Sequence, residues 1–210
     1  KILSSDRLSE IVRDADVYVS FTDPVAEVTN IPIVANLGKR IILGTTGFNP
    51  DQTRQVVVAM SGKVPSVFSP NYSVGVNILF KILESLTAFP QGYDFSLSEI
   101  HHTGKKDAPS GTAKKLEQII SQTRNYTKIV YGREGISPRQ PAELESVAIR
   151  VGGVPGIHDV IVAGQYEMLR LEHTAFSRNV FAQGAVFAAE WLSKQNEPKV
   201  FSMADVLGLS

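Results

Sequence analysis

Short β-prone runs alternate with helix-like segments through the first 70 residues. The runs at 16–21, 40–43 and 64–68 (DVYVSF, RIIL and VPSVF) are apolar and have the length of strands. Between the last two, Asn49 has the position of an N-cap and Pro50 that of a first helical residue. Helix-like pieces precede them at 25–29 and 33–37, and Pro32 between the two predicts a kink or a break. The alternation predicts βαβ units and a doubly wound α/β domain with a parallel sheet.

The pattern changes after Pro70. Segment 73–89 is apolar almost all round, which predicts a deeply buried helix. A strand at 94–100 and a helix capped by Ser110 follow, and β-prone runs across 145–176, separated by GGVPG and AGQ, predict antiparallel hairpins. Two helices close the chain. We therefore expect an α+β region after the parallel α/β region.

Charge and composition exclude several classes of function. Lys+Arg and Asp+Glu are both 21, so no global basic field favours nucleic acid or an anionic membrane. The chain has no cysteine, hence no disulfide and no thiolate metal site. No secretory segment or apolar span near 20 residues is present, which predicts a cytoplasmic protein. Because the chain begins at Lys1 rather than Met, we expect it to be a piece of a longer protein.

The run 99–113, EIHHTGKKDAPSGTA, is the segment richest in chemically active side chains. It follows a β-prone segment and ends at a helix start, so its backbone N–H groups and lysines suit an anion. His101 and His102 stand at a strand end and point to opposite faces, so one can act as an acid while the other binds or packs. A structural role for both histidines is the alternative.

A zinc site is the rival chemistry for these histidines, with His158 and His173 as further ligands. The pair lacks the i, i+4 helical spacing of common zinc motifs, and no cysteine stands beside it. The sequence therefore favours a site without metal.

Three small or polar loops follow successive predicted strands. They are FTDP at 21–24, GTTG at 44–47 and SPNYSVG at 69–75. Ligands of open α/β sheets bind at the carboxyl edge of the strands, so the three loops predict a cofactor cleft. The dinucleotide fingerprint G-x-G-x-x-G is absent, as expected if a first βαβ unit precedes Lys1.

The run 99–113 closely resembles the signature E-x-H-H-x-x-K-x-D-A-P-S-G-T-A of the dihydrodipicolinate reductase family. Further segments agree in order and spacing: FTDP, GTTGF, SPNYSVGVN, YGREG, the R-x-G-x-x-x-G-x-H run at 150–158, LEHTAFSR, FAQGAVFAAEWL and MADVLGL. The resemblance covers nearly the whole chain.

The resemblance implies roles for single residues on the substrate side. His101 matches the catalytic proton donor, and Lys105 matches a second catalytic and substrate-binding residue. His102, Lys105, Gly111 and Thr112 match the positions that hold the two carboxylates of a cyclic dicarboxylate substrate. The implied reaction is reduction of 4-hydroxy-tetrahydrodipicolinate to tetrahydrodipicolinate in lysine and diaminopimelate biosynthesis.

On the cofactor side, Gly44, Thr46, Ser69 and Tyr72 match loops that line the nicotinamide of NADPH or NADH. The implied fold is a Rossmann-type parallel-sheet cofactor domain plus an α+β substrate and tetramerisation domain with a mixed sheet. The domains would be 1–72 with 184–210, N-terminally incomplete, and 73–183, in a homotetramer. The alternatives are a related nicotinamide-dependent reductase of another amino or imino acid, and a noncatalytic dicarboxylate-binding relative.

Overall fold

The computed structural model describes residues 7–86 and 89–209. The chain forms two compact units, each with its own sheet. Unit 1 comprises Lys1–Val74 together with Phe181–Ser210, and unit 2 is the continuous segment Gly75–Val180. Unit 1 is thus assembled from the two end segments of the chain.

Unit 1 contains a four-stranded parallel sheet. In the order β1-β2-β3-β9, its strands are Val17–Ser20, Arg40–Leu43, Ser66–Phe68 and Val200–Phe201. Every neighbouring pair is parallel. The parallel sheet predicted from the alternating pattern is confirmed.

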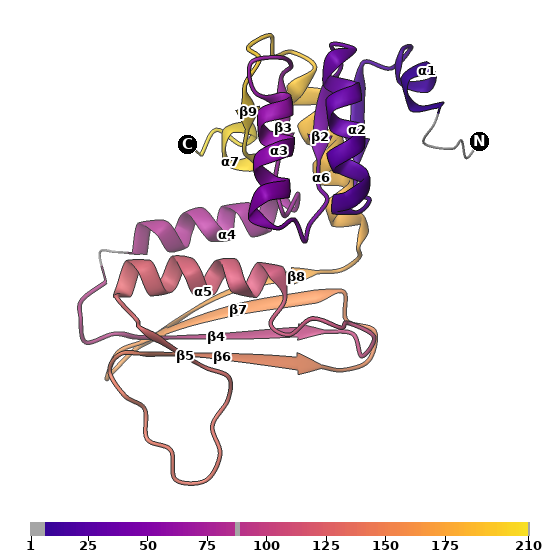
Figure 1. The fold of residues 1–210 in the computed structure, drawn as a ribbon. Helices are drawn as coiled ribbons and strands as arrows, with labels where there is room; N and C mark the ends of the chain where they lie inside the picture. The colour runs from indigo at the N-terminus through magenta and orange to yellow at the C-terminus, as the bar shows by residue number, and fades with distance from the viewer. Residues whose placement is uncertain (1–6, 87–88, 210) are drawn as a thin grey trace. The chain divides into compact units, whose positions relative to one another are not determined.

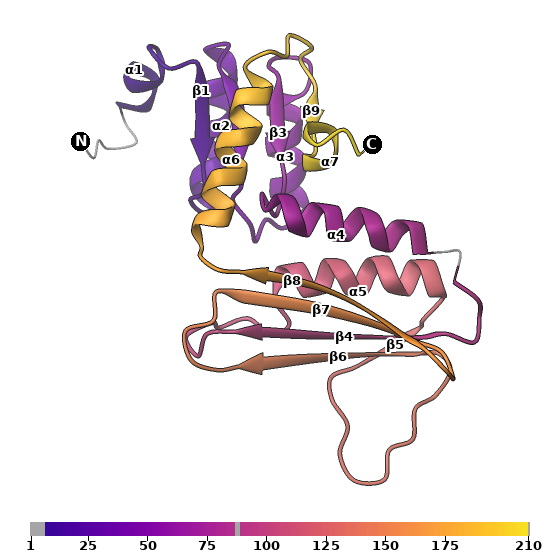
Figure 2. The same ribbon diagram turned by 180° about the vertical axis from the view of Figure 1, so that it is seen from behind.

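Helices cover both faces of this sheet, as the two opposite views show (Figures 1 and 2). The helices of unit 1 are α1 (Leu8–Val12), α2 (Pro24–Asn36), α3 (Pro50–Met60), α6 (Asn179–Leu192) and α7 (Met203–Val206). Ile41 and Leu43 of β2 pack in the core formed with α2 and α3, whereas Ile42 packs in the core formed with α6 and α7. The strand is apolar at successive positions because both of its faces are buried.

Of the kink or break predicted at Pro32, the break is wrong, because α2 continues through this residue. Proline removes one backbone hydrogen bond from a helix. On both sides of it, Ile31 and Val34 are fully buried, and their packing outweighs that loss. The prediction for α3 is confirmed: the Asn49 side chain accepts from the Gln52 N–H at 2.9 Å, and Gln52 Oε1 accepts from the Asn49 N–H at 3.0 Å.

Unit 2 contains a five-stranded mixed sheet. In the order β5-β6-β4-β7-β8, its strands are Lys128–Val130, Glu143–Arg150, Asp94–His101, Gly156–Ala163 and Met168–Ala175. The first three run parallel, and β7 and β8 run antiparallel to their neighbours. The hairpin predicted around AGQ is confirmed as β7–β8. The hairpin predicted at GGVPG is wrong, because β4 lies between β6 and β7. An α/β fold with one parallel and one mixed sheet is confirmed.

Two helices, α4 (Val74–Ser85) and α5 (Gly111–Arg124), lie side by side over the mixed sheet (Figure 1). Leu83 of α4 and Leu116 of α5 share one apolar core with the strands. Ile78 and Ile82 are 41% and 39% exposed, so the all-round burial predicted for 73–89 is wrong; residues 87–88 of that segment lie outside the described residues. No helix in the described part of the chain is long and apolar enough to span a membrane.

Candidate active site

Strand β4 brings an acid and a histidine to one buried position. Side chains alternate along a strand, and the buried members of β4 are Phe95, Leu97, Glu99 and His101. The first two enter the apolar core. The last two stand at the carboxyl end of β4, where the chain enters the loop 102–110.

Glu99 is fully buried, and both of its carboxylate oxygens have partners. Oε2 pairs with Nδ1 of His101. Oε1 accepts hydrogen bonds from the Ser110 N–H at 3.0 Å and from Nη2 of Arg150 at 2.8 Å. Burial raises the pKa of Glu99, but the hydrogen bonds from His101, Arg150 and Ser110 together outweigh burial and hold the pKa at about 2. Glu99 is therefore ionised at neutral pH and orients the His101 ring.

His158 of β7 is a second histidine at this position. It lies opposite Glu99 in the β4–β7 register, and its ring centroid is 5.1 Å from that of His101 at an interplanar angle of 74°. Its Nε2 lies 3.1 Å from Oγ of Ser110. Burial and, as the next largest cause, the nearby charge of His101 lower the pKa of His158 to about 3. His158 is therefore neutral at physiological pH.

The loop 102–110 carries the two lysines noted in the sequence. Nζ of Lys105 lies 2.8 Å from Oδ1 of Asp107, and the Lys105 side chain is 21% exposed. Burial raises the pKa of Asp107, but the hydrogen bond from Lys105 helps to bring it below its ordinary value. Lys106 is exposed. Lys105 is therefore the lysine that the loop holds in place.

The loop leads into the N-terminus of α5. Ser110 caps this helix by accepting a hydrogen bond from the Ala113 N–H at 3.2 Å. Gly111 and Thr112 are the first two helical residues, and a Cβ at Gly111 would meet no atom within 4 Å. The first N–H groups of a helix have no carbonyl partner within it, and they attract anions. The space beside Gly111, at this end of α5, is therefore open to a carboxylate.

The residues predicted on the substrate side thus lie in one strand–loop–helix segment of unit 2. His101 is buried at the end of β4, and His102 and Lys105 are half-buried in the loop. The His102 N–H donates to the Val154 carbonyl at 2.8 Å, and the Lys105 N–H donates to the His102 carbonyl at 3.1 Å. The connection between β6 and β7 therefore holds the loop in place.

Within the described residues, Glu99, His101 and His158 form a group whose potential metal-ligand atoms lie within 4.8 Å of one another. The guanidinium of Arg150 already compensates the charge of Glu99 through the bond at 2.8 Å. A cation entering this group would meet an occupied carboxylate and a neighbouring positive charge. The contacts favour a proton-transfer centre over the zinc site considered as its rival.

In unit 1, the loops after β1, β2 and β3 carry the residues predicted on the cofactor side. The Gly44 N–H donates to the Ser20 carbonyl at 2.9 Å, and a Cβ at Gly44 would overlap the ring of Phe21. The Tyr72 hydroxyl lies 3.0 and 2.9 Å from backbone carbonyls of β2 and β3 and is buried, which raises its pKa. Ser69 is buried and donates to a backbone carbonyl at 2.8 Å. Tyr72 and Ser69 therefore shape the loops from inside.

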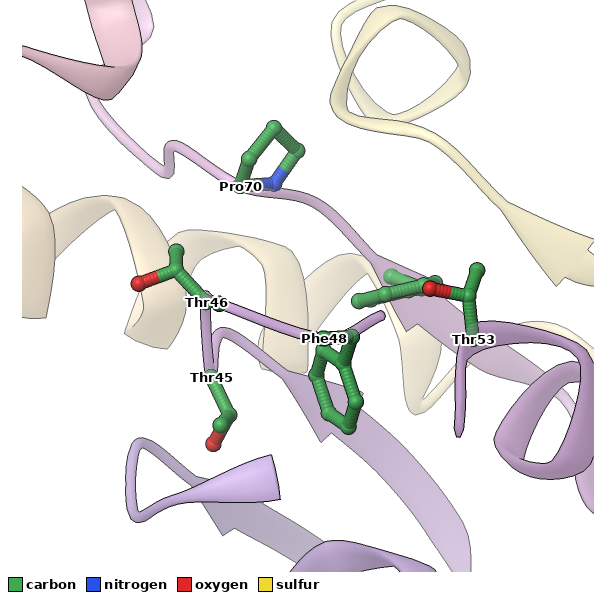
Figure 3. A pocket seen from close by; sticks show the side chains of 7 residues that line it. Thr45, Thr46, Phe48, Thr53 and Pro70 are labelled. Atoms are coloured by element: carbon green, nitrogen blue, oxygen red, sulfur yellow. The ribbon is translucent and has the colours of Figure 1, made fainter. Parts of the chain in front are cut away.

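A hollow of about 260 Å³ lies beside the GTTG loop, and Figure 3 shows the side chains that line it. It is lined by Thr45, Thr46, Gly47, Phe48, Thr53, Phe68 and Pro70. The rings of Phe48 and Phe68 meet edge to face, with centroids 5.7 Å apart. Of the predicted cofactor residues, Thr46 lines this hollow, whereas Gly44, Ser69 and Tyr72 are not among its lining residues.

Two contributors to the site were missed by the sequence reasoning. Arg150 was noticed only as part of a motif, yet it bonds both Glu99 and the Asp107 carbonyl, the latter at 2.6 Å. In the sequence, His158 is a candidate only as a further ligand of the rival zinc site. Arg150 lies opposite His101 in the β4–β6 register. The pairing of the strands would have identified both residues, but this pairing cannot be read from a single sequence.

The chain is thus an α/β protein of two units. One unit has a parallel sheet with small or polar loops at the carboxyl ends of its strands, and the other has a mixed sheet with a buried acid–histidine pair. Comparison with known proteins narrows this class. The family model described as dihydrodipicolinate reductase, N-terminus, matches residues 1–72, and the model for the C-terminus matches residues 75–207. The chain belongs to the dihydrodipicolinate reductase family.

Its relatives are similar over most of their length. The 4-hydroxy-tetrahydrodipicolinate reductase of Methanosarcina barkeri is 47% identical over 93% of this chain and 74% of its own length. The enzyme of the same name from Aquifex aeolicus is 42% identical over 98% of this chain and 78% of its own length. The solved dipicolinate-bound dihydrodipicolinate reductase from Paenisporosarcina sp. TG-14 has a TM-score of 0.77 at 22% identity, covering 97% of this chain and 77% of that chain. This last likeness shows the fold.

Proposed function

We infer that the chain is an oxidoreductase that reduces 4-hydroxy-tetrahydrodipicolinate to tetrahydrodipicolinate with NADPH or NADH. This is a step of lysine and diaminopimelate biosynthesis. Relatives that are 40–47% identical bear the name of this activity. The observation that carries the inference is the buried Glu99–His101 pair, which precedes a lysine and the open N-terminus of α5 in the same segment.

We propose that the substrate's two carboxylates are held by this segment. Lys105 and His102 would contribute side-chain contacts, and Gly111 and Thr112 their backbone N–H groups. Supporting this, the loop holds Lys105 through Asp107 and leaves space beside Gly111. Fixed donors and a cation also stabilise charge that develops during reaction, since they need no reorganisation.

His101 is the proposed proton donor. Its Nδ1 is paired with Glu99, which leaves Nε2 to exchange a proton with substrate. Loss of the substrate's 4-hydroxyl as water leaves an unsaturated ring. One carbon of that ring accepts a hydride, and the neighbouring carbon accepts the proton of His101. His101 then takes up a new proton from solvent. A nicotinamide cofactor, when bound, would supply this hydride.

We propose residues 1–72 and 184–210 as the cofactor domain and 73–183 as the substrate domain. Gly44, Thr46, Ser69 and Tyr72 are the proposed cofactor-side residues. Supporting the fit, Thr46 lines the hollow beside its loop. A flat ring carrying an amide suits a hollow of aromatic walls and threonine hydroxyls.

Replacement of His101 by glutamine tests the assignment. We expect kcat to fall by about 10²- to 10⁴-fold, the range for loss of a general acid. Binding of NADPH and of pyridine-2,6-dicarboxylate should stay within about threefold, because neither requires proton transfer. A wild-type chain that oxidises neither NADPH nor NADH with this substrate would overturn the function. An active His101→Gln variant would overturn only the role of His101.

We further propose that the chain works in the cytoplasm as a homotetramer. In support of an interface between copies, β8 exposes the apolar side chains of Met168 and Leu169, and the adjacent Tyr166 is 91% exposed. Sedimentation equilibrium distinguishes a tetramer from smaller species, and cell fractionation tests the compartment.

A further inference from the structure

Glu27 is a fully buried acid outside the strand–loop–helix segment. It lies in the first turn of α2, and its side chain has no exposed surface. A buried carboxylate is costly unless hydrogen bonds compensate its desolvation. The groups that donate hydrogen bonds to Glu27 therefore indicate its role.

Three hydroxyl groups converge on a single oxygen of Glu27. Oε1 accepts from Oγ1 of Thr22 at 2.7 Å and from Oγ1 of Thr45 at 2.8 Å, and Oγ of Ser20 also donates to it. Thr45 Oγ1 in turn accepts from the Thr22 N–H at 2.9 Å. The second oxygen, Oε2, is buried and has no hydrogen-bond partner among the described residues.

The three donors come from the ends of two neighbouring strands. Ser20 is the last residue of β1, and Thr22 belongs to the FTDP loop that follows it. Thr45 follows β2 within GTTG and is 3% exposed. A single carboxylate oxygen thus joins the two loops, although Glu27 belongs to neither.

Thr45 stands between the proposed cofactor residues Gly44 and Thr46. Its hydroxyl donates to Glu27, and both Thr45 and Thr46 line the hollow (Figure 3). Fixing the side chain of Thr45 fixes the backbone on both sides of it. Without the acceptor at Glu27, the buried hydroxyls of Thr45 and Ser20 would lose this hydrogen bond, and the FTDP and GTTG loops could then adopt other conformations.

We propose that Glu27 is a positioning residue for cofactor binding, which holds the FTDP and GTTG loops in the conformation that receives NADPH or NADH. The inference rests on the proposed function and deepens it. Glu27 acts through Thr45 and Thr22 and does not touch the cofactor. Its removal therefore weakens cofactor binding and leaves the chemistry of His101 in place.

The test compares Glu27→Gln with wild type and with Glu190→Gln, a matched change at an exposed residue of α6. Glutamine keeps the shape, but it is a weaker acceptor and places an amide without a partner at the Oε2 position. We expect the Kd and KM for NADPH to rise about tenfold, while kcat at saturating NADPH stays within twofold. A tenfold change corresponds to about 1.4 kcal/mol of lost preference for the binding conformation. Glu190→Gln should match wild type.

Binding of pyridine-2,6-dicarboxylate reports unit 2 separately and should be unchanged in Glu27→Gln. Thr45→Val and Thr45→Ser provide a second pair, because only the first removes the hydroxyl. Thr45→Val should weaken NADPH binding, and Thr45→Ser should retain it.

Unchanged NADPH affinity in Glu27→Gln and Thr45→Val would overturn the positioning role. Equal losses of NADPH affinity, dicarboxylate affinity and kcat would overturn it too, since they would indicate general damage to the fold. Failure of wild type to bind either NADPH or NADH would instead overturn the proposed function and, with it, this inference.

Discussion

Replacement of Glu99 by glutamine should reveal how much the buried carboxylate stabilises unit 2. Glutamine has nearly the same volume and can still accept from Ser110. It lacks the negative charge that compensates Arg150 at 2.8 Å and pairs with His101. The variant therefore isolates the charge of Glu99 from its size.

The structure gives the size of the effect. The pKa of Glu99 lies at about 2 instead of 4.5, a difference worth about 3 kcal/mol in favour of the ionised form. Because the folded-state pKa is depressed, this stabilisation is present above pH 4.5 and is lost as the pH falls from 4.5 towards 2. At pH 7, Glu99→Gln should lower the free energy of unfolding by about 3 kcal/mol, the range for breaking one side of a buried pair.

Urea unfolding followed by circular dichroism at pH 7 and between pH 5 and 3 measures the difference. Trp191 is the only tryptophan and belongs to unit 1, so its fluorescence is an internal control that should change little. Glu84→Gln, at an exposed position of α4, is the matched control and should cost less than 0.5 kcal/mol. The difference between wild type and Glu99→Gln should shrink below pH 4.5. Equal stability of the two at pH 7 would refute the reasoning.

Two further predictions concern the neighbours of this acid. His158 has a folded-state pKa of about 3 instead of 6.5, so below pH 6.5 the unfolded chain takes up a proton that the folded chain excludes, and up to about 5 kcal/mol of stability is lost by pH 3. His158→Gln should therefore reduce the dependence of the free energy of unfolding on pH between 6.5 and 3, and an unchanged dependence would contradict the assignment. A Cβ at Gly156 would lie 3.0 Å from Nε2 of His101. Since Glu99 fixes the ring at Nδ1, Gly156→Ala should lower kcat about tenfold with little change in the KM for NADPH. An unchanged kcat would show that the His101 ring moves to accommodate the added methyl group.

Much of the fold could be predicted because its signals are local. The apolar run RIIL, the cap at Asn49 and the helix start at Ser110 each determine structure within a few residues. Pairing is not local. The GGVPG turn looks like a hairpin connection in sequence. In the sheet, however, β4 lies between β6 and β7, although it precedes the turn by about fifty residues in the chain. Likewise, Pro32 predicts a break unless the burial of its neighbours is known.

The candidate site divides in the same way. His101, His102 and Lys105 could be selected from one dense run of sequence. Arg150 could not, because its link to Glu99 is made by the parallel register of β4 and β6. Glu27 gave no signal at all in sequence, since an acid in a first helical turn is ordinary until three buried hydroxyls are found on one of its oxygens.

The two-part origin of unit 1 has a consequence for how the protein is made. One core of its parallel sheet packs Ile42 and Val67 against Ala185, Leu192 and Phe201, which the ribosome adds after unit 2. Unit 2 is a continuous segment completed earlier. We therefore expect unit 2 to fold while synthesis is still under way, and the early strands of unit 1 to wait, with one apolar face uncovered, until α6 and β9 emerge. Those strands are where a chaperone bound to the growing chain should be found.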